Sequence, residues 1–227
     1  MKKDLNCVMY IARHGETDWN MKKLLMGGGS DIPLNQNGEQ QAKELSEHLD
    51  DIHFDAIFSS SLERATKTAE YVALKRKLAV KTTEALKERR FGPYEGKHYS
   101  VLNNELKDTL EKFDELPDEE KFSFKLHDGI ESDEELEARV ITYLREVSVA
   151  YQGKTVLILC HGAIMRFLLW KFGMGTYKQL DYDVVEIHNT AYIKVRSDGV
   201  DFFVDDVYRI EGLPEWRSLK SSKHVVV

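Results

Sequence analysis

Three apolar runs stand out along the chain, at residues 8–12, 56–58 and 155–160. The last run is apolar at positions that face both sides of a strand, which is typical of the centre of a parallel sheet. Segments with apolar residues at helical spacing lie between and after these runs. Their apolar positions are Ala42, Leu45 and Leu49; Ala65, Ala69 and Val72; Leu136, Val140, Leu144 and Val147; and Ile164, Phe167 and Leu168. Strands that alternate with such helices predict an α/β fold with parallel strands.

The rest of the pattern predicts how the sheet is completed. A short strand is expected at residues 78–80, and three apolar stretches near the C-terminus are expected to close the sheet, with a turn at 197–199. These stretches are residues 184–187, 191–195 and 200–207. Ser59, Ser60 and Ser61 are suitable N-caps for the helix that contains Ala65.

Residues 97–132 differ in composition from the rest of the chain. They are rich in acids, contain no arginine and predict a helix over 101–113. We expect this segment to form a cap-like insertion over the sheet. Because no repeat or low-complexity linker divides the chain, we expect one domain over residues 1–212 and a tail over 213–227.

The charge and composition exclude several classes of function. The 227 residues carry a net charge of -7 and have a pI of about 5.7, which argues against nucleic acid or an anionic membrane as the main partner. No signal peptide or membrane-spanning stretch is predicted, and Cys7 and Cys160 are too few for a disulfide framework. We expect a cytoplasmic protein that binds a small molecule. The sequence leaves open whether the protein forms a homodimer.

Four chemically active segments are predicted to meet at one edge of this sheet. Arg13 and His14 follow the first apolar run, Arg64 lies in the first turn after the second, and His161 follows the third. Glu88 lies in a loop of charged, glycine and aromatic residues at 86–96. The carboxyl ends of parallel strands form the usual binding crevice of an open α/β sheet. Guanidinium groups and imidazoles there suit phosphoryl transfer, with a histidine as nucleophile and a carboxylic acid as proton donor.

Each of these residues also has an ordinary structural explanation when taken singly. Arg64 would then be an exposed helix residue and His161 a strand-end histidine. The acids of 97–132 fit a solvated face better than a metal site, because no histidine or cysteine accompanies them at ligand spacing. Cys160 is expected to pack in the core, since neighbours on a strand point to opposite faces. The glycines at 27–29 are expected to form a mobile lip of the site, without the spacing of a nucleotide-binding loop.

From about residue 8 to residue 207 the chain resembles the histidine phosphatase superfamily, the phosphoglycerate mutase-like fold. The matching motifs are Arg13-His14-Gly15-Glu16-Thr17, Trp19-Asn20, Asp31-x-Pro33-Leu34, Gly38-x-x-Gln41-Ala42, Ser60-x-x-x-Arg64-Ala65, Glu88 with Gly92 and Glu95-Gly96, and His161-Gly162. The resemblance implies a three-layer α/β/α sandwich, in which a mixed, mainly parallel sheet has helices on both faces.

The same resemblance implies a role for each residue of the set. His14 would be the nucleophile that becomes phosphohistidine, and Glu88 the general acid and later base. Arg13, Arg64 and His161 would hold the phosphoryl oxygens. Thr17, Asn20 and Gly162 would line the phosphate pocket, with a lesser contact from Asn189. No metal and no cofactor is implied.

The sequence favours a phosphatase over a mutase within this superfamily. Mutases carry arginines in the insertion to hold a bisphosphate intermediate, whereas residues 97–132 have none. Two segments are similar to motifs of the phosphatase branch, which contains sugar phosphatases. These segments are Gly129-Ile130-Glu131-Ser132 and Tyr94-Glu95-Gly96-Lys97. Two interpretations remain for four basic residues, either as contacts for a second phosphate or as solvated charges. These residues are Lys22, Lys23, Arg89 and Arg90. A phosphoglycerate mutase, a protein phosphatase of this fold and a binding module without turnover are the alternatives.

Overall fold

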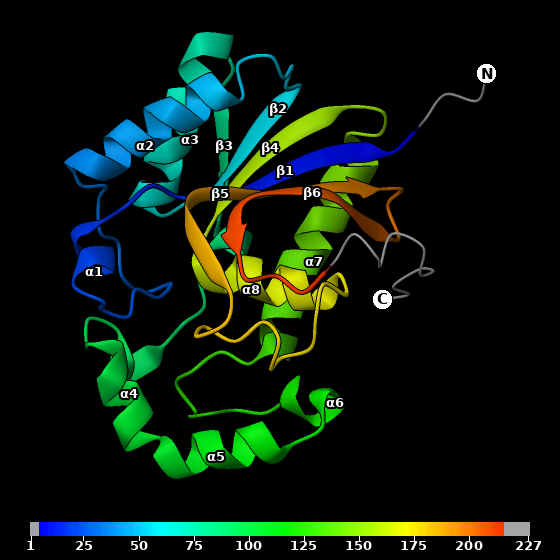
Figure 1. The fold of residues 1–227 in the computed structure, drawn as a ribbon. Helices are drawn as coiled ribbons and strands as arrows, with labels where there is room; N and C mark the ends of the chain where they lie inside the picture. Colours follow the sequence, from blue (N-terminus) through cyan, green and yellow to red (C-terminus); the bar gives the residue numbers. More distant parts are fainter. Residues whose placement is uncertain (1–4, 216–227) are drawn as a thin grey trace.

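The computed structural model describes residues 5–215, and its six strands form one sheet in the order β3-β2-β4-β1-β5-β6 (Figure 1). The strands are β1 Cys7–Arg13, β2 Ala56–Ser60, β3 Val80–Thr83, β4 Thr155–Cys160, β5 Glu186–Ser197 and β6 Phe202–Glu211. The first four strands in this order pair in parallel, and β5 and β6 pair antiparallel to their neighbours. The sheet is therefore mixed and mainly parallel, as predicted.

Four long helices cover the two faces of the sheet. Helices α2 Gln36–His48 and α3 Glu63–Arg76 lie on one face, and α7 Asp133–Ala150 and α8 Gly162–Lys171 lie on the other (Figure 1). Each face has its own apolar core, because successive strand residues point to opposite sides. Met9 and Ile11 pack on the α7 and α8 side, whereas Tyr10 and Ala12 pack on the α2 and α3 side. This is the expected three-layer α/β/α sandwich.

Residues 97–132 lie apart from the sheet, on the side of α7 and α8 (Figure 1). They contain α4 Tyr99–Glu105, α5 Lys107–Glu115 and α6 Asp118–Lys121, so the helix expected over 101–113 is two helices that break at Leu106. A small separate core fixes the segment to the body, and it centres on Tyr94, Leu102 and Ile130. The short elements α1 Asp18–Met21, η1 Glu84–Leu86 and η2 Gly92–Tyr94 connect the main ones.

The C-terminal strands differ from the predicted ones. Residues 186–187 and 191–195 of the predicted stretches belong to a single strand, β5, whose register shifts between Ile187 and Tyr192, whereas residues 184–185 precede the strand. Thr190 lies within this irregularity at a φ of +61°. Asn189, beside it, breaks the apolar alternation, and the prediction therefore divided one strand in two. Residues 213–215 are in neither a helix nor a strand, and the rest of the expected tail lies outside the described residues.

The serine N-cap predicted for α3 is wrong. Ser59 and Ser60 belong to β2, and the N-cap is Leu62, which makes no side-chain cap. Asp31 supplies the missing acceptor instead, because its Oδ1 accepts the N–H of Glu63 at 2.7 Å. An acid from a distant loop therefore satisfies the start of the helix that carries Arg64.

The loop after β1 passes very close to the start of α2. A Cβ on Gly38 would lie 2.0 Å from the carbonyl oxygen of Glu16, and one on Gly15 would lie 2.4 Å from the carbonyl oxygen of Gly38. Both contacts are to backbone, which cannot move aside without shifting the loop that carries His14.

Gly38→Ala is therefore expected to lower the free energy of unfolding by about 1–3 kcal/mol through overpacking, and to reduce activity as well. Chemical denaturation and phosphate release measure the two effects. Gln40→Ala, at an exposed position of the same helix, is the control and should change neither. A Gly38→Ala protein with unchanged stability and activity would contradict the close packing described here.

Candidate active site

His14 is the first residue after β1, and its backbone fixes the ring at the edge of the sheet. Its N–H donates to the carbonyl oxygen of Cys160 at 3.1 Å, which continues the pairing of β1 with β4. The ring Nδ1 lies 2.6 Å from the carbonyl oxygen of Gly15. A carbonyl only accepts, so Nδ1 carries the proton and Nε2 keeps its lone pair. This tautomer presents Nε2 as a nucleophile.

His161 lies next to His14 because the strands that carry them are paired. Arg13 is opposite Cys160 in the parallel register, so the residues that follow both strands emerge side by side. The two imidazole centroids are 5.2 Å apart, and His161 is fully buried as the N-cap of α8. Within the described residues, neither ring nitrogen of His161 has a hydrogen-bond partner. Such unsatisfied buried nitrogens are costly and point to a ligand.

Burial lowers the pKa of both histidines well below the ordinary value of 6.5. The positive charges of Arg64 and Arg13 lower the pKa of both rings further, and the neighbouring His14 also lowers that of His161. Both imidazoles are therefore neutral in the free protein at neutral pH. A protonated imidazole at His161, as a ligand of the phosphoryl oxygens, therefore requires the negative charge of a bound phosphoryl group.

These lowered pKa values make the folded protein sensitive to acid. Below pH 6.5 the unfolded chain binds protons at both histidines and the folded chain does not, so the free energy of unfolding falls as the pH falls. Each histidine should contribute a loss of roughly 2 kcal/mol between about pH 7 and about pH 5. Denaturant titrations at the two pH values measure this loss.

In His161→Asn, the free energy of unfolding that is lost between about pH 7 and about pH 5 should be smaller by roughly 2 kcal/mol, which is the contribution of one histidine. His53→Asn is the matched control, because the side chain of His53 is 88% exposed. If His161→Asn and the unaltered protein lost the same free energy of unfolding on acidification, the lowered pKa of His161 would be contradicted.

Two arginines lie beside the histidines. Arg13, the last residue of β1, donates through Nη1 to the carbonyl oxygen of Ile187 at 2.5 Å. Arg64 is fully buried in the first turn of α3, and it donates to the carbonyl oxygens of Ser30 at 2.7 Å and Gly27 at 3.4 Å. The Nε atoms of both arginines are buried without a partner in the described part of the chain. Burial lowers the pKa of Arg64 to about 10, so it keeps its charge at neutral pH.

The glycine loop around residues 27–29 packs against the loop that carries Glu88. A Cβ on Gly28 would lie 2.6 Å from the carbonyl oxygen of Glu88, and one on Gly27 would lie 2.1 Å from Oε1 of Glu95. Glu95 also accepts from Ser30 Oγ at 2.6 Å. These glycines therefore permit a close approach of two loops, and the carbonyl of Gly27 accepts from Arg64. The contacts place the glycine loop beside the site, and its mobility stays a prediction.

Glu88 lies between η1 and η2, and its carboxylate faces the start of α8. Its oxygens accept the backbone N–H groups of Arg89 at 2.8 Å, Ala163 at 3.0 Å and Ile164 at 3.2 Å. The side chain is almost completely buried, and its charge acts on Arg13 and Arg64. The structure thus brings Glu88 to the same edge as both arginines and His161.

The remaining predicted residues line the same edge. Thr17 and Asn20 form a capping box around α1, and Asn189 donates to the carbonyl oxygen of His14 at 3.1 Å. Gly162 starts α8, where a Cβ would lie 3.4 Å from Nε of Arg13. The irregular turn of β5 thus supports the backbone of His14 as well as lying near the pocket.

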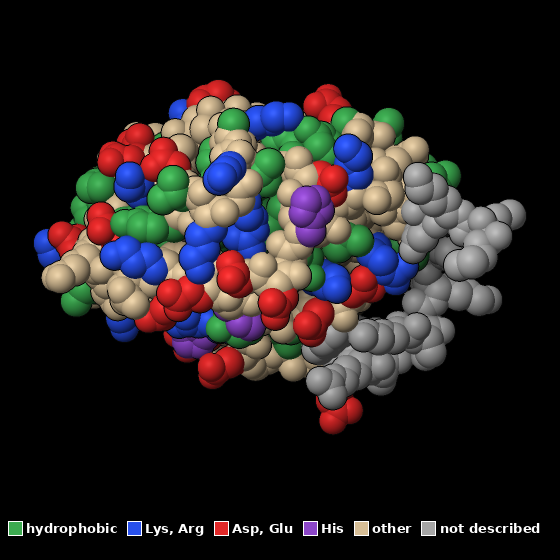
Figure 2. Space-filling model, turned by 90° about the horizontal axis from the view of Figure 1, so that it is seen from above, with side chains coloured by type: hydrophobic (Ala, Val, Ile, Leu, Met, Phe, Trp, Pro, Cys, Tyr) green, Lys and Arg blue, Asp and Glu red, His purple; other side chains and the backbone are tan. Residues whose placement is uncertain are grey.

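Of the four basic residues considered for a second phosphate, Arg89 is paired within the protein. It forms an ion pair with Asp133, which also accepts from the hydroxyl of Tyr177 at 2.7 Å. The side chain of Arg90 is 60% exposed and lies 3.8 Å from Glu131, whereas Lys22 and Lys23 are exposed. On the face shown in Figure 2, acidic and basic side chains are intermixed without a continuous basic patch among the described residues. The cations that the structure brings beside His14 are the buried Arg64 and the half-buried Arg13.

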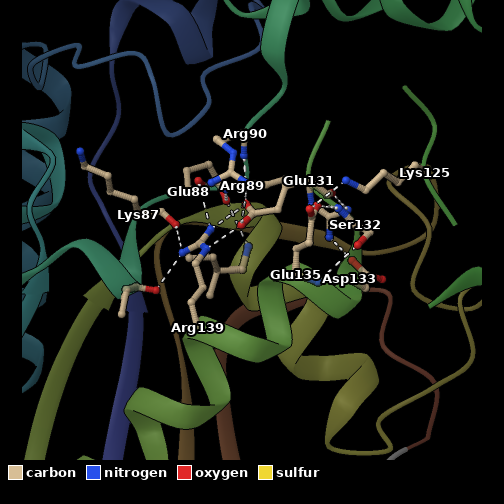
Figure 3. A network of polar contacts seen from close by, with 12 residues as sticks. Lys87, Glu88, Arg89, Arg90, Lys125, Glu131, Ser132, Asp133, Glu135 and Arg139 are labelled. Atoms are coloured by element: carbon tan, nitrogen blue, oxygen red, sulfur yellow. Dashed lines mark hydrogen bonds and ion pairs between the residues drawn. The ribbon is translucent and has the colours of Figure 1, made fainter. Parts of the chain in front are cut away.

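A polar network beside Glu88, shown in Figure 3, is not predicted by the sequence pattern. It joins Glu131, at the end of the cap, to Arg139 of α7, and Asp133, the first residue of α7, to Arg89. The only sequence signal was the Gly-x-Glu-Ser pattern at 129–132, which was used to choose a branch of the superfamily. Arg139 occupies a polar position of an amphipathic helix, where solvent exposure is the ordinary expectation.

Other candidate chemistry is not supported by the geometry. Cys7 and Cys160 are free and buried, and burial raises the pKa of both thiols, that of Cys7 to about 11. Cys160 therefore packs in the core, as predicted. Among residues 5–215, no cluster of three metal-ligating side chains occurs. No helix in that same range is long and apolar enough to cross a bilayer.

Comparison with known proteins agrees with this geometry. The sequence profile of the histidine phosphatase superfamily (branch 1) matches residues 9–208. The protein called uncharacterized phosphatase PhoE of Bacillus subtilis (strain 168) is 36% identical over 201 residues, which are 88% of this chain and 91% of PhoE. Fructose-2,6-bisphosphatase TIGAR B of Danio rerio is 43% identical over 105 residues, which are 44% of this chain and 40% of that protein.

A solved structure shows the same architecture. YhfR of Bacillus stearothermophilus is 26% identical and superposes with a TM-score of 0.76, over 92% of this chain and 98% of that one. The family match includes part or all of each of the six strands and every residue of the site described above. The chain therefore belongs to the histidine phosphatase superfamily and is a phosphoric monoester hydrolase.

Proposed function

We propose that the protein hydrolyses phosphomonoesters of small metabolites, such as sugar phosphates, through a phosphohistidine on His14 and without a metal. The observation that carries this proposal is the tautomer of His14. Its Nδ1–H is held by the Gly15 carbonyl, so Nε2 is free to attack beside the buried Arg64 and the half-buried Arg13. A neutral imidazole in such a place is a competent nucleophile.

The reaction proceeds in two balanced steps. In the first, Nε2 of His14 forms a bond to phosphorus as the ester P–O bond breaks, and Glu88, which takes up a proton when the phosphoester binds, gives that proton to the leaving oxygen. In the second, water attacks phosphorus, Glu88 takes a proton from that water, and the N–P bond breaks to release phosphate. A carboxyl group that serves as acid and then as base is ordinary general acid–base catalysis.

The buried cations stabilise the charge that the phosphoryl group carries. Arg64 reaches the site as a planar fork held by two carbonyls, and Arg13 is held by a third. Bidentate guanidinium groups match the equatorial oxygens of a phosphoryl group. His161 has two unpartnered ring nitrogens and can bind a phosphoryl oxygen once the bound anion raises its pKa.

The charge of residues 97–132 favours hydrolysis over a mutase reaction. Within this segment the described side chains include clustered acids, as at Asp118, Glu119 and Glu120, and no arginine. An acidic cap repels the bisphosphate intermediate that a mutase must retain. The exposed Lys22 and Lys23, which directly follow α1 and its residue Asn20, are the cations proposed to contact a second phosphate on the substrate.

The test is phosphate release from a panel of sugar phosphates, phosphoglycerates and phosphopeptides, measured with a chelator present. We expect release from sugar phosphates and an alkali-stable, acid-labile phosphoenzyme in quenched samples. Interconversion of phosphoglycerates without phosphate release would instead establish the mutase. A preference for phosphopeptides would establish a protein phosphatase, and binding without turnover would overturn the enzymatic proposal.

A further inference from the structure

The segment that carries Glu88 has no secondary structure of its own to hold it. Residues 87–91 form neither helix nor strand between η1 and η2. A general acid must lie within hydrogen-bond reach of the leaving oxygen, and a displacement of about 1 Å can cost about 100-fold in rate. Something outside this segment must therefore fix its backbone.

One guanidinium group holds three backbone carbonyls at and just before Glu88. Arg139 of α7 donates through Nη1 to the carbonyl oxygens of Ala85 at 2.8 Å and Lys87 at 2.6 Å. Its Nη2 donates to the carbonyl oxygen of Glu88 itself at 3.3 Å. Three backbone acceptors on and before the acid are thus held by a single side chain, as Figure 3 shows.

Glu131 fixes both Arg139 and the far side of the same segment. Its carboxylate accepts from Arg139 Nε at 2.8 Å and Nη2 at 2.9 Å, and from the N–H of Arg90 at 3.2 Å. Its own N–H donates to the carbonyl oxygen of Arg90 at 3.0 Å. Burial alone would raise the pKa of Glu131, but the hydrogen bonds and charge of Arg139 lower it, so the carboxylate stays charged.

We infer that Arg139 and Glu131 are positioning residues that hold Glu88 in place for proton transfer to the leaving group. They bracket Glu88, with Arg139 on the carbonyls of residues 85, 87 and 88 and Glu131 on the backbone of residue 90. Neither side chain is needed to bind phosphate in this scheme. The inference rests on the proposed function, because it concerns the step in which Glu88 acts.

Loss of proton donation has a signature that loss of folding lacks. A leaving group that departs as a stable anion needs no proton from the general acid, whereas a more basic leaving group does. The probes are para-nitrophenyl phosphate and phenyl phosphate, which have nearly the same shape and differ in leaving-group basicity. The readout is kcat/KM for para-nitrophenyl phosphate divided by kcat/KM for phenyl phosphate. This parameter covers the steps up to departure of the phenol, and a raised ratio means that the ester with the more basic leaving group has lost more activity.

We expect Arg139→Met and Glu131→Gln to raise this ratio by about tenfold or more, as Glu88→Gln does. Arg139→Lys, which keeps a donor and the charge, should restore part of the loss. Glu88→Gln combined with Arg139→Met should have the same ratio as Glu88→Gln alone, because Arg139 acts through Glu88. Lys171→Met is the matched control. Lys171, the last residue of α8, forms an ion pair at 2.8 Å with Glu137 of α7, the helix that carries Arg139, and its loss should leave the ratio unchanged.

The outcomes separate this inference from the proposed function. An equal loss on both esters in Arg139→Met and Glu131→Gln, with a raised ratio in Glu88→Gln, would overturn the positioning role alone. An unchanged ratio in Glu88→Gln would overturn the role of Glu88 as acid and the inference with it. Absence of phosphate release by the unaltered protein would overturn both. If Arg139→Met does not fold, Arg139→Lys and Glu131→Gln decide the result.

Discussion

His14→Ala is expected to lower kcat/KM for phosphomonoesters on the order of 10⁴-fold or more and to abolish the phosphoenzyme. The side chain forms the covalent bond in the proposed reaction, and no other group can take its place in the pocket. His161 is the nearest imidazole, but neither of its nitrogens is oriented by a hydrogen bond among the described residues. Quenched-flow trapping of radiolabelled phosphoenzyme and steady-state phosphate release measure the two effects.

His161→Ala is the informative comparison for this prediction. It removes a ligand of the phosphoryl oxygens and keeps the nucleophile, so it should lower kcat/KM by roughly 10²- to 10³-fold while a phosphoenzyme still forms. The reverse pattern, with phosphoenzyme in His14→Ala and none in His161→Ala, would assign the nucleophile to the other histidine. Thermal unfolding of both variants excludes misfolding as the cause.

Arg64→Met is expected to lower kcat/KM by about 10³-fold, with most of the loss in kcat. Methionine fills much of the same volume and removes the charge and the planar fork that would face the phosphoryl oxygens. The carbonyls of Ser30 and Gly27, which accept from Arg64, also lose their donor. Steady-state kinetics on a phosphomonoester measure the activity, and circular dichroism checks the fold.

Arg76→Met is the matched control for Arg64→Met. Arg76 lies at the other end of α3 and also donates to backbone carbonyls, those of Leu49, Ile52 and Val72, but far along the chain from the site. Its loss should reduce stability and leave kcat/KM unchanged. Equal losses of activity in the two variants would show that Arg64 acts through the fold and not through phosphate. Arg64→Lys should fall between the two, because it keeps the charge without the fork.

The parts of the fold and site that the sequence predicts are those fixed by strong local patterns. The apolar runs that end in Arg13 and Cys160 identify two neighbouring strands, and the parallel register then brings His14 and His161 together. Arg64 is also predicted, because it follows a strand at the start of an amphipathic helix. The local signal for Glu88 is weaker, because it rests on the charged, glycine and aromatic composition of its loop, and the resemblance to a family then made the role of this one acid specific.

The missed features depend on contacts between distant segments. The N–H of Glu63 is satisfied by Asp31, so the nearby serines were wrongly chosen as caps. Asn189 belongs to one irregular strand, because its side chain reaches back to the carbonyl of His14. Arg139 lies on an amphipathic helix, and nothing in its local sequence shows that Ala85 and Lys87 accept from it. Such pairings exist only once the chain has folded.

The way residues 97–132 are attached determines how the protein could be re-engineered for other substrates. None of the residues proposed to touch the phosphoryl group lies in this segment, so it could be exchanged for another module without altering the reacting atoms. Two conditions limit the exchange. The replacement must bring its own apolar face for Tyr94, which packs with Leu102 and Ile130, and it must end in a carboxylate at the place of Glu131. A graft that meets only the first condition would fold and bind yet transfer protons poorly.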